Sequence, residues 1–68
     1  MVQMMKNKIK VLRKEMGLRQ EDMAEKVGVT RQTIIAIENN KYNPTLELAM
    51  RIAVLLDTQV EDIFELSD

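Results

Sequence analysis

The stretch Gln20–Lys41, QEDMAEKVGVTRQTIIAIENNK, decides how this chain folds. It contains two short amphipathic runs separated by Gly28, and the second run begins at Thr30. Glycine ends a helix readily because it adopts positive φ, and threonine starts one because its hydroxyl accepts a hydrogen bond from an unpaired backbone N–H. The stretch therefore predicts two helices joined by a tight turn, over about residues 20–39.

The flanking sequence predicts three further helices and a single domain over residues 1–68. Apolar residues at helical spacing and capping residues indicate the boundaries. The five helices are expected at about Lys6–Met16, Gln20–Val27, Thr30–Asn39, Leu46–Leu56 and from Val60 onward. The predicted fold class is thus all-α.

Three details refine this prediction. Ile9, Leu12 and Met16 form the apolar stripe of the first helix, and Gly17 is expected to end it. Asn40 is expected to adopt the left-handed conformation that ends the third helix. At the two chain ends, apolar and polar residues alternate, which allows a small two-stranded sheet; the apolar positions are Val2, Met4, Phe64 and Leu66.

Composition narrows the function. The chain has no Cys and no His, which removes the commonest nucleophiles, bases and zinc ligands, so we expect no metal and no cofactor. The acidic pairs Glu21–Asp22 and Glu61–Asp62 are adjacent in sequence and point to different helix faces, so we expect no enzyme. No apolar run approaches the roughly 18 residues that span a bilayer, and a cytoplasmic location is expected.

Charge is unevenly distributed along the chain. Residues 1–42 carry nine basic and five acidic residues, whereas residues 43–68 carry one basic and six acidic residues. These charges are compatible with ordinary solvated helix faces. They are equally compatible with an N-terminal half that faces phosphates and an acidic end that points away from them.

Three segments together resemble one known family. Leu18–Lys41, followed by Tyr42–Ala49 (YNPTLELA) and Val60–Phe64 (VEDIF), is similar to the Cro and lambda-repressor type of helix-turn-helix family, also called the XRE family. The resemblance covers about residues 6–64 and is closest to short regulators that contain little besides this domain. It implies that the helix over residues 30–39 is the recognition helix, which lies in the major groove of DNA.

The resemblance implies base contacts from the first turn of the recognition helix. Arg31 suits guanine O6 and N7, Gln32 suits adenine N6 and N7, and Thr33 suits a phosphate or a thymine methyl. Ile35 and Ala36 follow on the same helix, where they either contact thymine methyls or are isolated surface hydrophobes.

Backbone contacts are implied at both ends of the motif. In the family, a glutamine at the position of Gln20 binds a phosphate and braces the recognition helix. Asn39, Lys41 and Tyr42 occupy positions that contact phosphates, although Tyr42 could equally pack on the domain. Arg19 departs from the family pattern, since Ser or Thr usually caps the second helix there and arginine has no acceptor, so fraying is expected. Arg19 is instead a candidate phosphate ligand.

Two inward-facing charges interrupt apolar stripes, Arg13 in the first helix and Glu38 in the third. Several relatives join these positions by a partly buried ion pair, and the same pair is expected here. The alternative is that both are ordinary surface charges.

The helix over residues 46–56 has more apolar surface than one small core can cover. The excess implies a partner surface, unless loops or the chain ends cover it. A symmetric dimer would place two recognition helices about 34 Å apart on a palindromic operator. The candidate interface residues are Leu48, Met50, Val54 and Leu55.

The sequence therefore predicts a transcriptional regulator that binds specific double-stranded DNA, as a homodimeric repressor without a small-molecule domain. The alternative is a protein-interaction module, such as an antitoxin-like or adapter domain, whose main partner is another, regulatory protein. The acidic overall balance gives that alternative some support.

Overall fold

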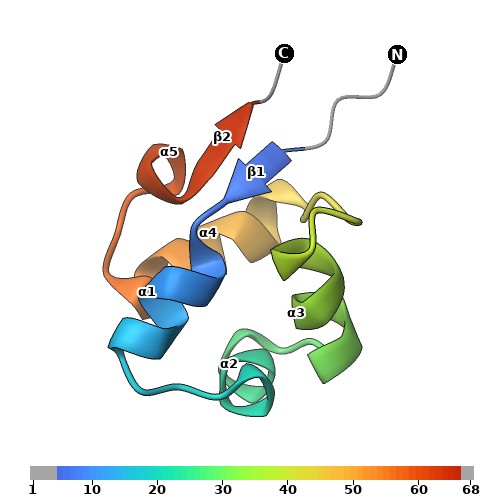
Figure 1. The fold of residues 1–68 in the computed structure, drawn as a ribbon, viewed down its shortest axis with the longest axis vertical. Coiled ribbons are helices and arrows are strands. Elements are labelled where there is room, and N and C mark those ends of the chain that lie inside the picture. The colour runs from blue at the N-terminus through green and yellow to red at the C-terminus, as the bar shows by residue number, and fades with distance from the viewer. Residues whose placement is uncertain (1–4, 67–68) are drawn as a thin grey trace.

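The structure is a computed structural model that describes residues 5–66, within which five helices and two short strands form (Figure 1). This confirms the predicted five-helix class and the additional two-stranded sheet. The elements in chain order are β1 (Met5–Asn7), α1 (Ile9–Glu15), α2 (Gln20–Val27), α3 (Arg31–Glu38), α4 (Leu46–Leu56), α5 (Val60–Ile63) and β2 (Phe64–Leu66).

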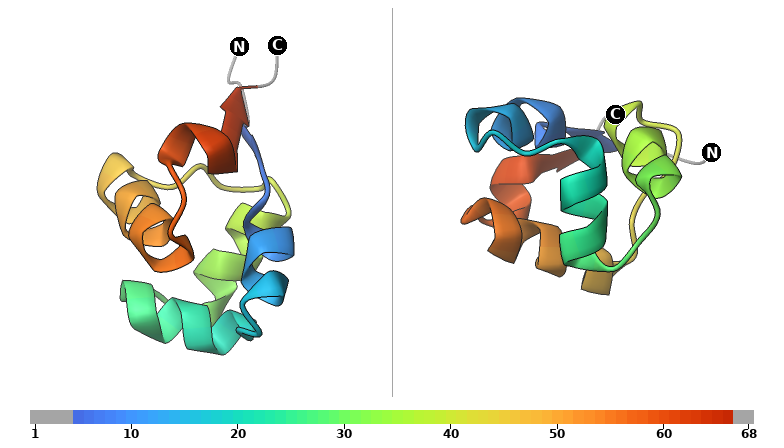
Figure 2. Two further views of the ribbon diagram at one scale, coloured as in Figure 1. Left: turned by 90° about the vertical axis from the view of Figure 1, so that its left-hand side faces the viewer. Right: turned by 90° about the horizontal axis from the view of Figure 1, so that it is seen from below.

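The two strands lie at one end of the molecule and α2 lies at the other (Figures 1 and 2). The strands are antiparallel, with Lys6 opposite Glu65. Within the described residues, the helices surround one core of thirteen buried apolar side chains. Those with almost no solvent exposure are Ile9, Met23, Ile34, Ile37, Ile52 and Ile63.

The helix boundaries around the central motif follow from local chemistry, as predicted. Gly28 adopts φ +79° at the end of α2. Thr30 Oγ1 accepts a hydrogen bond from Thr33 N at 3.3 Å, and Thr45 Oγ1 accepts one from Leu48 N at 3.2 Å. These contacts satisfy backbone donors that a helix start leaves unpaired, so α3 and α4 begin at defined positions.

The end of α3 closes with a Schellman motif, which fixes the path of the following loop. Asn40 adopts φ +59°, its N–H donates to Ile37 O at 3.0 Å, and Lys41 N donates to Ala36 O at 2.8 Å. The left-handed geometry predicted for Asn40 is therefore confirmed.

The predicted start of the first helix was wrong, because Met5–Asn7 is a strand and α1 begins at Ile9. Lys8 N donates to Ile63 O at 2.9 Å, and Asn7 Oδ1 accepts from Ile9 N at 3.2 Å. These contacts and the pairing of Met5–Asn7 with β2 hold this segment against the C-terminal part of the described chain, so the helix begins only at Ile9. Met16 was also misplaced, since it is half-exposed and lies just beyond the end of α1.

The predicted sheet forms from partly different residues. Phe64 and Leu66 lie in β2 as expected, and their partners are Asn7 and Met5. Val2 and Met4, the residues expected on the first strand, lie outside the described residues.

Helix α4 has the predicted bounds and an exposed apolar face. Met50 is 54% exposed and Val54 is 81% exposed, whereas Leu55 is partly buried against the core. The proposal that Leu48 contributes to an interface was wrong, because Leu48 is only 8% exposed and belongs to the core. Among the helices of residues 5–66, none has the length and apolar character needed to cross a membrane.

Candidate nucleic-acid interface

The first turn of α3 presents three polar side chains next to its N-cap. Arg31 and Gln32 are exposed, and Thr33 is partly exposed. The Thr33 hydroxyl lies 3.1 Å from the Thr30 hydroxyl, so the capping residue also orients a side chain of the turn. The turn therefore offers a guanidinium, an amide and a hydroxyl group from one short, well-anchored segment.

Helix α3 is anchored in the core by Ile34 and Ile37, which are almost completely buried. Ile35 and Ala36 are partly buried. Ile35 is thus less exposed than expected from the sequence, because neighbouring side chains cover part of it. The two residues still contribute an apolar area beside the polar first turn.

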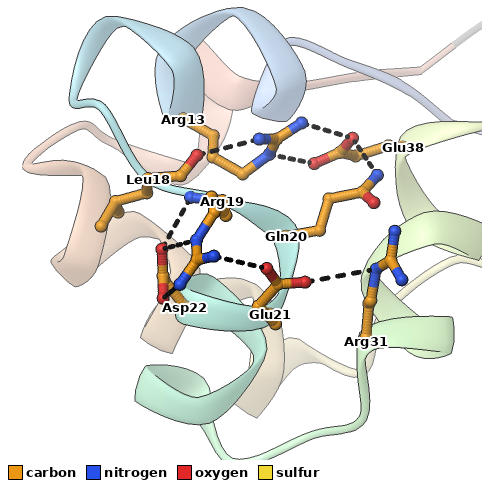
Figure 3. Close-up of polar contacts among 8 residues, drawn as sticks. All are labelled: Arg13, Leu18, Arg19, Gln20, Glu21, Asp22, Arg31 and Glu38. Atoms are coloured by element: carbon orange, nitrogen blue, oxygen red, sulfur yellow. Dashed lines mark hydrogen bonds and ion pairs between the residues drawn. The ribbon is translucent and has the colours of Figure 1, made fainter.

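A buried ion pair ties α1 to the end of α3 (Figure 3). Arg13 Nε donates to Glu38 Oε2 at 2.7 Å and Nη2 donates to Oε1 at 3.2 Å. The two side chains are only 7% and 3% exposed. Arg13 Nη1 also donates to Leu18 O at 2.9 Å, so one guanidinium connects α1, the loop before α2 and α3. The ion pair expected from the sequence is present.

Gln20, the first residue of α2, extends this network toward the surface. Its Nε2 donates to Glu38 Oε1 at 3.2 Å, and its amide oxygen points away from that carboxylate (Figure 3). Glu38 therefore accepts hydrogen bonds from both Arg13 and Gln20. The contact braces α3 from the start of α2 and holds the glutamine in one orientation.

Arg19 occupies the N-cap position of α2 without acting as a side-chain cap. Its backbone N–H donates to Asp22 Oδ2 at 3.0 Å, which is half of a capping box. Its guanidinium also contacts Asp22, with Nε 3.2 Å from Oδ2. Fraying is thus opposed by the carboxylate three residues ahead.

The same contacts shift two pKa values. The Arg19 backbone N–H, followed by its guanidinium, lowers the pKa of Asp22 below its usual range. Hydrogen bonding to Asp22, followed by the charges of Asp22 and Glu21, raises the pKa of Arg19. Both shifts favour the charged forms, so the contact between Arg19 and Asp22 is an ion pair at the start of α2.

Glu21 contacts two of the candidate interface residues, and the sequence prediction did not include it. Its Oε2 lies 3.6 Å from Arg31 Nε, and its Oε1 lies 3.3 Å from Arg19 Nη1. A glutamate near a helix start is commonly explained by its favourable interaction with the helix dipole, so nothing in its position indicated that Glu21 pairs with an arginine. The only available signal was the spacing that places both Glu21 and Arg31 in the first turns of successive helices.

The end of α3 presents Asn39, Lys41 and Tyr42, all of which are exposed. Asn7, a second residue that the prediction missed, supports this end from β1. Its Nδ2 donates to Ile37 O at 2.7 Å and to Asn40 Oδ1 at 3.2 Å. The loop that carries the three exposed residues is thus fixed to the sheet.

Comparison with known proteins identifies the arrangement. A family model described as helix-turn-helix matches residues 9–63, which is most of the chain. The chain belongs to the XRE-type helix-turn-helix family. This family consists of DNA-binding transcriptional regulators, which are not enzymes, and its partner is double-stranded DNA.

Individual relatives agree with this assignment. The chain is 55% identical over 64 residues to an uncharacterized HTH-type transcriptional regulator of Methanocaldococcus jannaschii, covering 94% of this chain and 97% of that protein. It is 39% identical over 56 residues to the immunity repressor protein of Bacillus phage phi105, covering 82% of this chain and 39% of the repressor.

A solved structure has the same fold. The crystal structure of a candidate DNA-binding protein from Bacteroides fragilis superimposes with a TM-score of 0.81 at 31% identity. The match covers 91% of this chain and all of that one. The helices α2 and α3 of this chain are the two helices of the helix-turn-helix motif, and the exposed first turn of α3 lies at the start of the second helix.

Proposed function

We propose that this chain is a sequence-specific repressor that binds a palindromic operator as a homodimer, with α3 in the major groove. The observation that carries the proposal is the exposed first turn of α3. Thr30 caps this turn, and the Arg13–Glu38 pair joins the other end of α3 to α1. A recognition helix needs exposed polar side chains, and its backbone must be rigid so that these side chains can distinguish one base from another.

Base contacts are assigned to the first turn and the residues that follow it. Arg31 would bind guanine, Gln32 would bind adenine, and Thr33 would contact a phosphate or a thymine methyl. Ile35 and Ala36 supply apolar surface for thymine methyls. Gln32 makes no side-chain hydrogen bond within residues 5–66, so its amide has no internal contact to break before it binds a base.

Backbone contacts are assigned to both ends of the motif. Arg19 and Gln20 lie at the start of α2, where the backbone N–H groups and the side chains offer donors to a phosphate. Asn39, Lys41 and Tyr42 lie after α3 on the loop that Asn7 fixes. Two groups of phosphate ligands on either side of α3 would set its depth and orientation in the groove.

The dimer is assigned to the exposed face of α4. An open groove of about 630 Å³ is lined by four apolar side chains of α4, and three charged side chains border it. The apolar residues are Leu46, Met50, Val54 and Leu55, and the charged ones are Lys26, Glu47 and Arg51. Burying such a surface in a second copy removes apolar area from water and would stabilise a domain near the lower size limit.

The repressor assignment is supported by the similarity to the phage phi105 immunity repressor. Residues 5–66 form one compact unit with a single core. Such a unit would act most simply by occupying a promoter so that polymerase cannot bind.

Selection from randomised duplexes tests the proposal directly. The protein should enrich a palindrome, and binding should weaken steeply with salt because phosphate contacts release counterions. Gln32→Ala should reduce the preference at one position of each half-site, whereas the matched control Gln59→Ala, at the start of α5, should not. Failure to enrich any sequence at low salt would overturn the assignment.

Solution mass tests the dimer. Val54→Glu places a charge in the proposed interface and should give a monomer with weaker operator binding. Val11→Glu is the matched control, since Val11 is an exposed valine on α1. A parent protein that is monomeric at the concentrations where it binds its operator would contradict the homodimer.

A second candidate function uses the same α4 groove, as the docking site of a different regulatory protein. It requires that the parent protein is monomeric and lacks sequence preference for DNA. The two measurements above therefore separate an interaction module from a repressor.

A further inference from the structure

Glu21 lies between two arginines where α2 and α3 begin (Figure 3). One carboxylate oxygen faces Arg31 Nε at 3.6 Å and the other faces Arg19 Nη1 at 3.3 Å. A single side chain thus links the start of the supporting helix to the first turn of the recognition helix.

The Arg31 contact leaves the terminal part of the guanidinium available. A guanidinium carries five N–H donors in one plane, and Glu21 faces the one on Nε, nearest the aliphatic stem. The terminal Nη1 and Nη2 lie on the side away from the carboxylate (Figure 3). Two donors on one edge match the O6 and N7 acceptors of guanine.

Glu21 is itself held in place. Arg19, which contacts its Oε1, is fixed by Asp22 through a 3.2 Å contact of Nε with Oδ2 and through the 3.0 Å backbone hydrogen bond. The chain Asp22–Arg19–Glu21–Arg31 therefore extends from the anchored start of α2 to the proposed guanine ligand.

We propose that Glu21 is a positioning residue for base recognition, which directs the terminal edge of Arg31 toward a guanine and lowers attraction to DNA of any sequence. The inference rests on the proposed function, because it assigns Glu21 a role in that same site.

The two effects of Glu21 have opposite signs, and this distinguishes positioning from a structural role. Its negative charge opposes phosphates in every duplex, so removing the charge strengthens non-specific binding. Its contact with Arg31 favours only the correct base, so removing the contact weakens discrimination. Loss of a purely structural residue would instead weaken binding to every duplex and lower the melting temperature.

The test compares Glu21→Gln with Glu25→Gln. Glu25 lies one turn later on α2, is exposed, and forms no ion pair within residues 5–66, so its substitution removes the same charge without a contact to Arg31. Three duplexes serve as probes. The first is a duplex selected by the parent protein, and the second differs from it by one base pair, at the position where Arg31→Ala loses its base preference. The third has a random sequence.

We expect Glu21→Gln to lower the affinity ratio between the first two duplexes by about 1.4-fold to fivefold, the range of one exposed ion pair, and to raise affinity for the random duplex. Glu25→Gln should leave the ratio unchanged. In an Arg31→Ala background, Glu21→Gln should not lower the ratio further, because no guanidinium remains to be positioned.

Several results overturn the inference while leaving the proposed function intact. These are an unchanged ratio in Glu21→Gln, an equal loss for all three duplexes with a lower melting temperature, or an Arg31→Ala variant that keeps every base preference. A parent protein that selects no sequence overturns the proposed function itself.

Discussion

The buried pair Arg13–Glu38 and the exposed chain Asp22–Arg19–Glu21–Arg31 contain the same chemical groups in opposite surroundings. The side chains of the first are 7% and 3% exposed, whereas Arg19 and Arg31 are 74% and 60% exposed. The buried pair joins α1 to the end of α3, whereas the exposed chain joins the start of α2 to the first turn of α3.

The difference lies in what water does to each network. Solvent screens the exposed charges, so their pairing adds little to stability, and the side chains are accessible to DNA. The buried charges have lost their hydration and depend on each other, so removing one partner is expensive. The difference in burial thus gives the two networks different roles. The buried pair stabilises the position of α3, and the exposed chain presents charged side chains that are free to contact DNA.

Glu38→Ala should have the largest effect, because it leaves the Arg13 guanidinium buried without its carboxylate. We expect the free energy of unfolding to fall by about 3–5 kcal/mol, a large part of what a domain of this size has. Urea denaturation followed by circular dichroism measures it. Glu25→Ala, on an exposed acid, is the control.

The double variant Arg13→Met with Glu38→Met keeps this prediction falsifiable if Glu38→Ala does not fold. Replacing both partners by apolar side chains of similar length should recover most of the lost stability. If Glu38→Ala and Arg13→Met were each as stable as the parent protein, the comparison of buried and exposed networks would be wrong.

Arg31→Ala should show the opposite pattern in the exposed chain. Stability should change by less than about 0.5 kcal/mol, because the lost ion pair is solvated. Operator binding should weaken by about 1–3 kcal/mol, the value of one bidentate base contact. Thermal unfolding and fluorescence anisotropy with the selected duplex measure the two quantities. A drop in stability larger than the drop in binding would make Arg31 a structural residue.

Gln20→Ala tests the residue that stands between the two networks. Losing its hydrogen bond to Glu38 should cost about 1 kcal/mol of stability, since Arg13 still satisfies that carboxylate. Operator affinity should fall as well, because a proposed phosphate ligand is lost. Measuring both on one sample would show whether Gln20 belongs to the buried network, to the exposed one, or to both. A variant identical to the parent protein in both would exclude it from either.

The sequence was sufficient for features set by neighbouring residues. Gly28, Thr30 and Thr45 fix helix ends through backbone geometry and short-range hydrogen bonds, so their positions could be predicted. The Arg13–Glu38 pair was expected from the family resemblance and from the interruption of two apolar stripes. Each of these signals has few competing interpretations.

Features that depend on distant partners were predicted only in part, since the two-stranded sheet was expected but the residues of its first strand and the partners of Glu21 were not. The strand at Met5–Asn7 forms because residues 57 or more positions later lie beside it, and the local sequence alone favoured a longer helix. Glu21 has two arginines within reach, and its ordinary role near a helix start gave no reason to assign either. The ion-pair partners of a long charged side chain depend on the tertiary structure, so the sequence alone does not predict them.

Asp22→Ala should have the smallest effect, and it tests whether the exposed chain contributes to folding at all. Asp22 accepts the backbone N–H of Arg19, and this contact, followed by the Arg19 guanidinium, lowers the pKa of its carboxyl group in the folded protein. A lowered pKa means that the stabilisation is fully present above the pKa of the unfolded chain. It is lost as the pH falls through the lower, folded value.

The melting temperature of Asp22→Ala should therefore be slightly below that of the parent protein at neutral pH, and the two melting temperatures should converge in strong acid. Glu25→Ala, which lacks such a contact, should show no comparable convergence. A difference that persisted unchanged below the folded pKa would mean that the charge of Asp22 does not stabilise α2, and that the exposed chain acts only in binding.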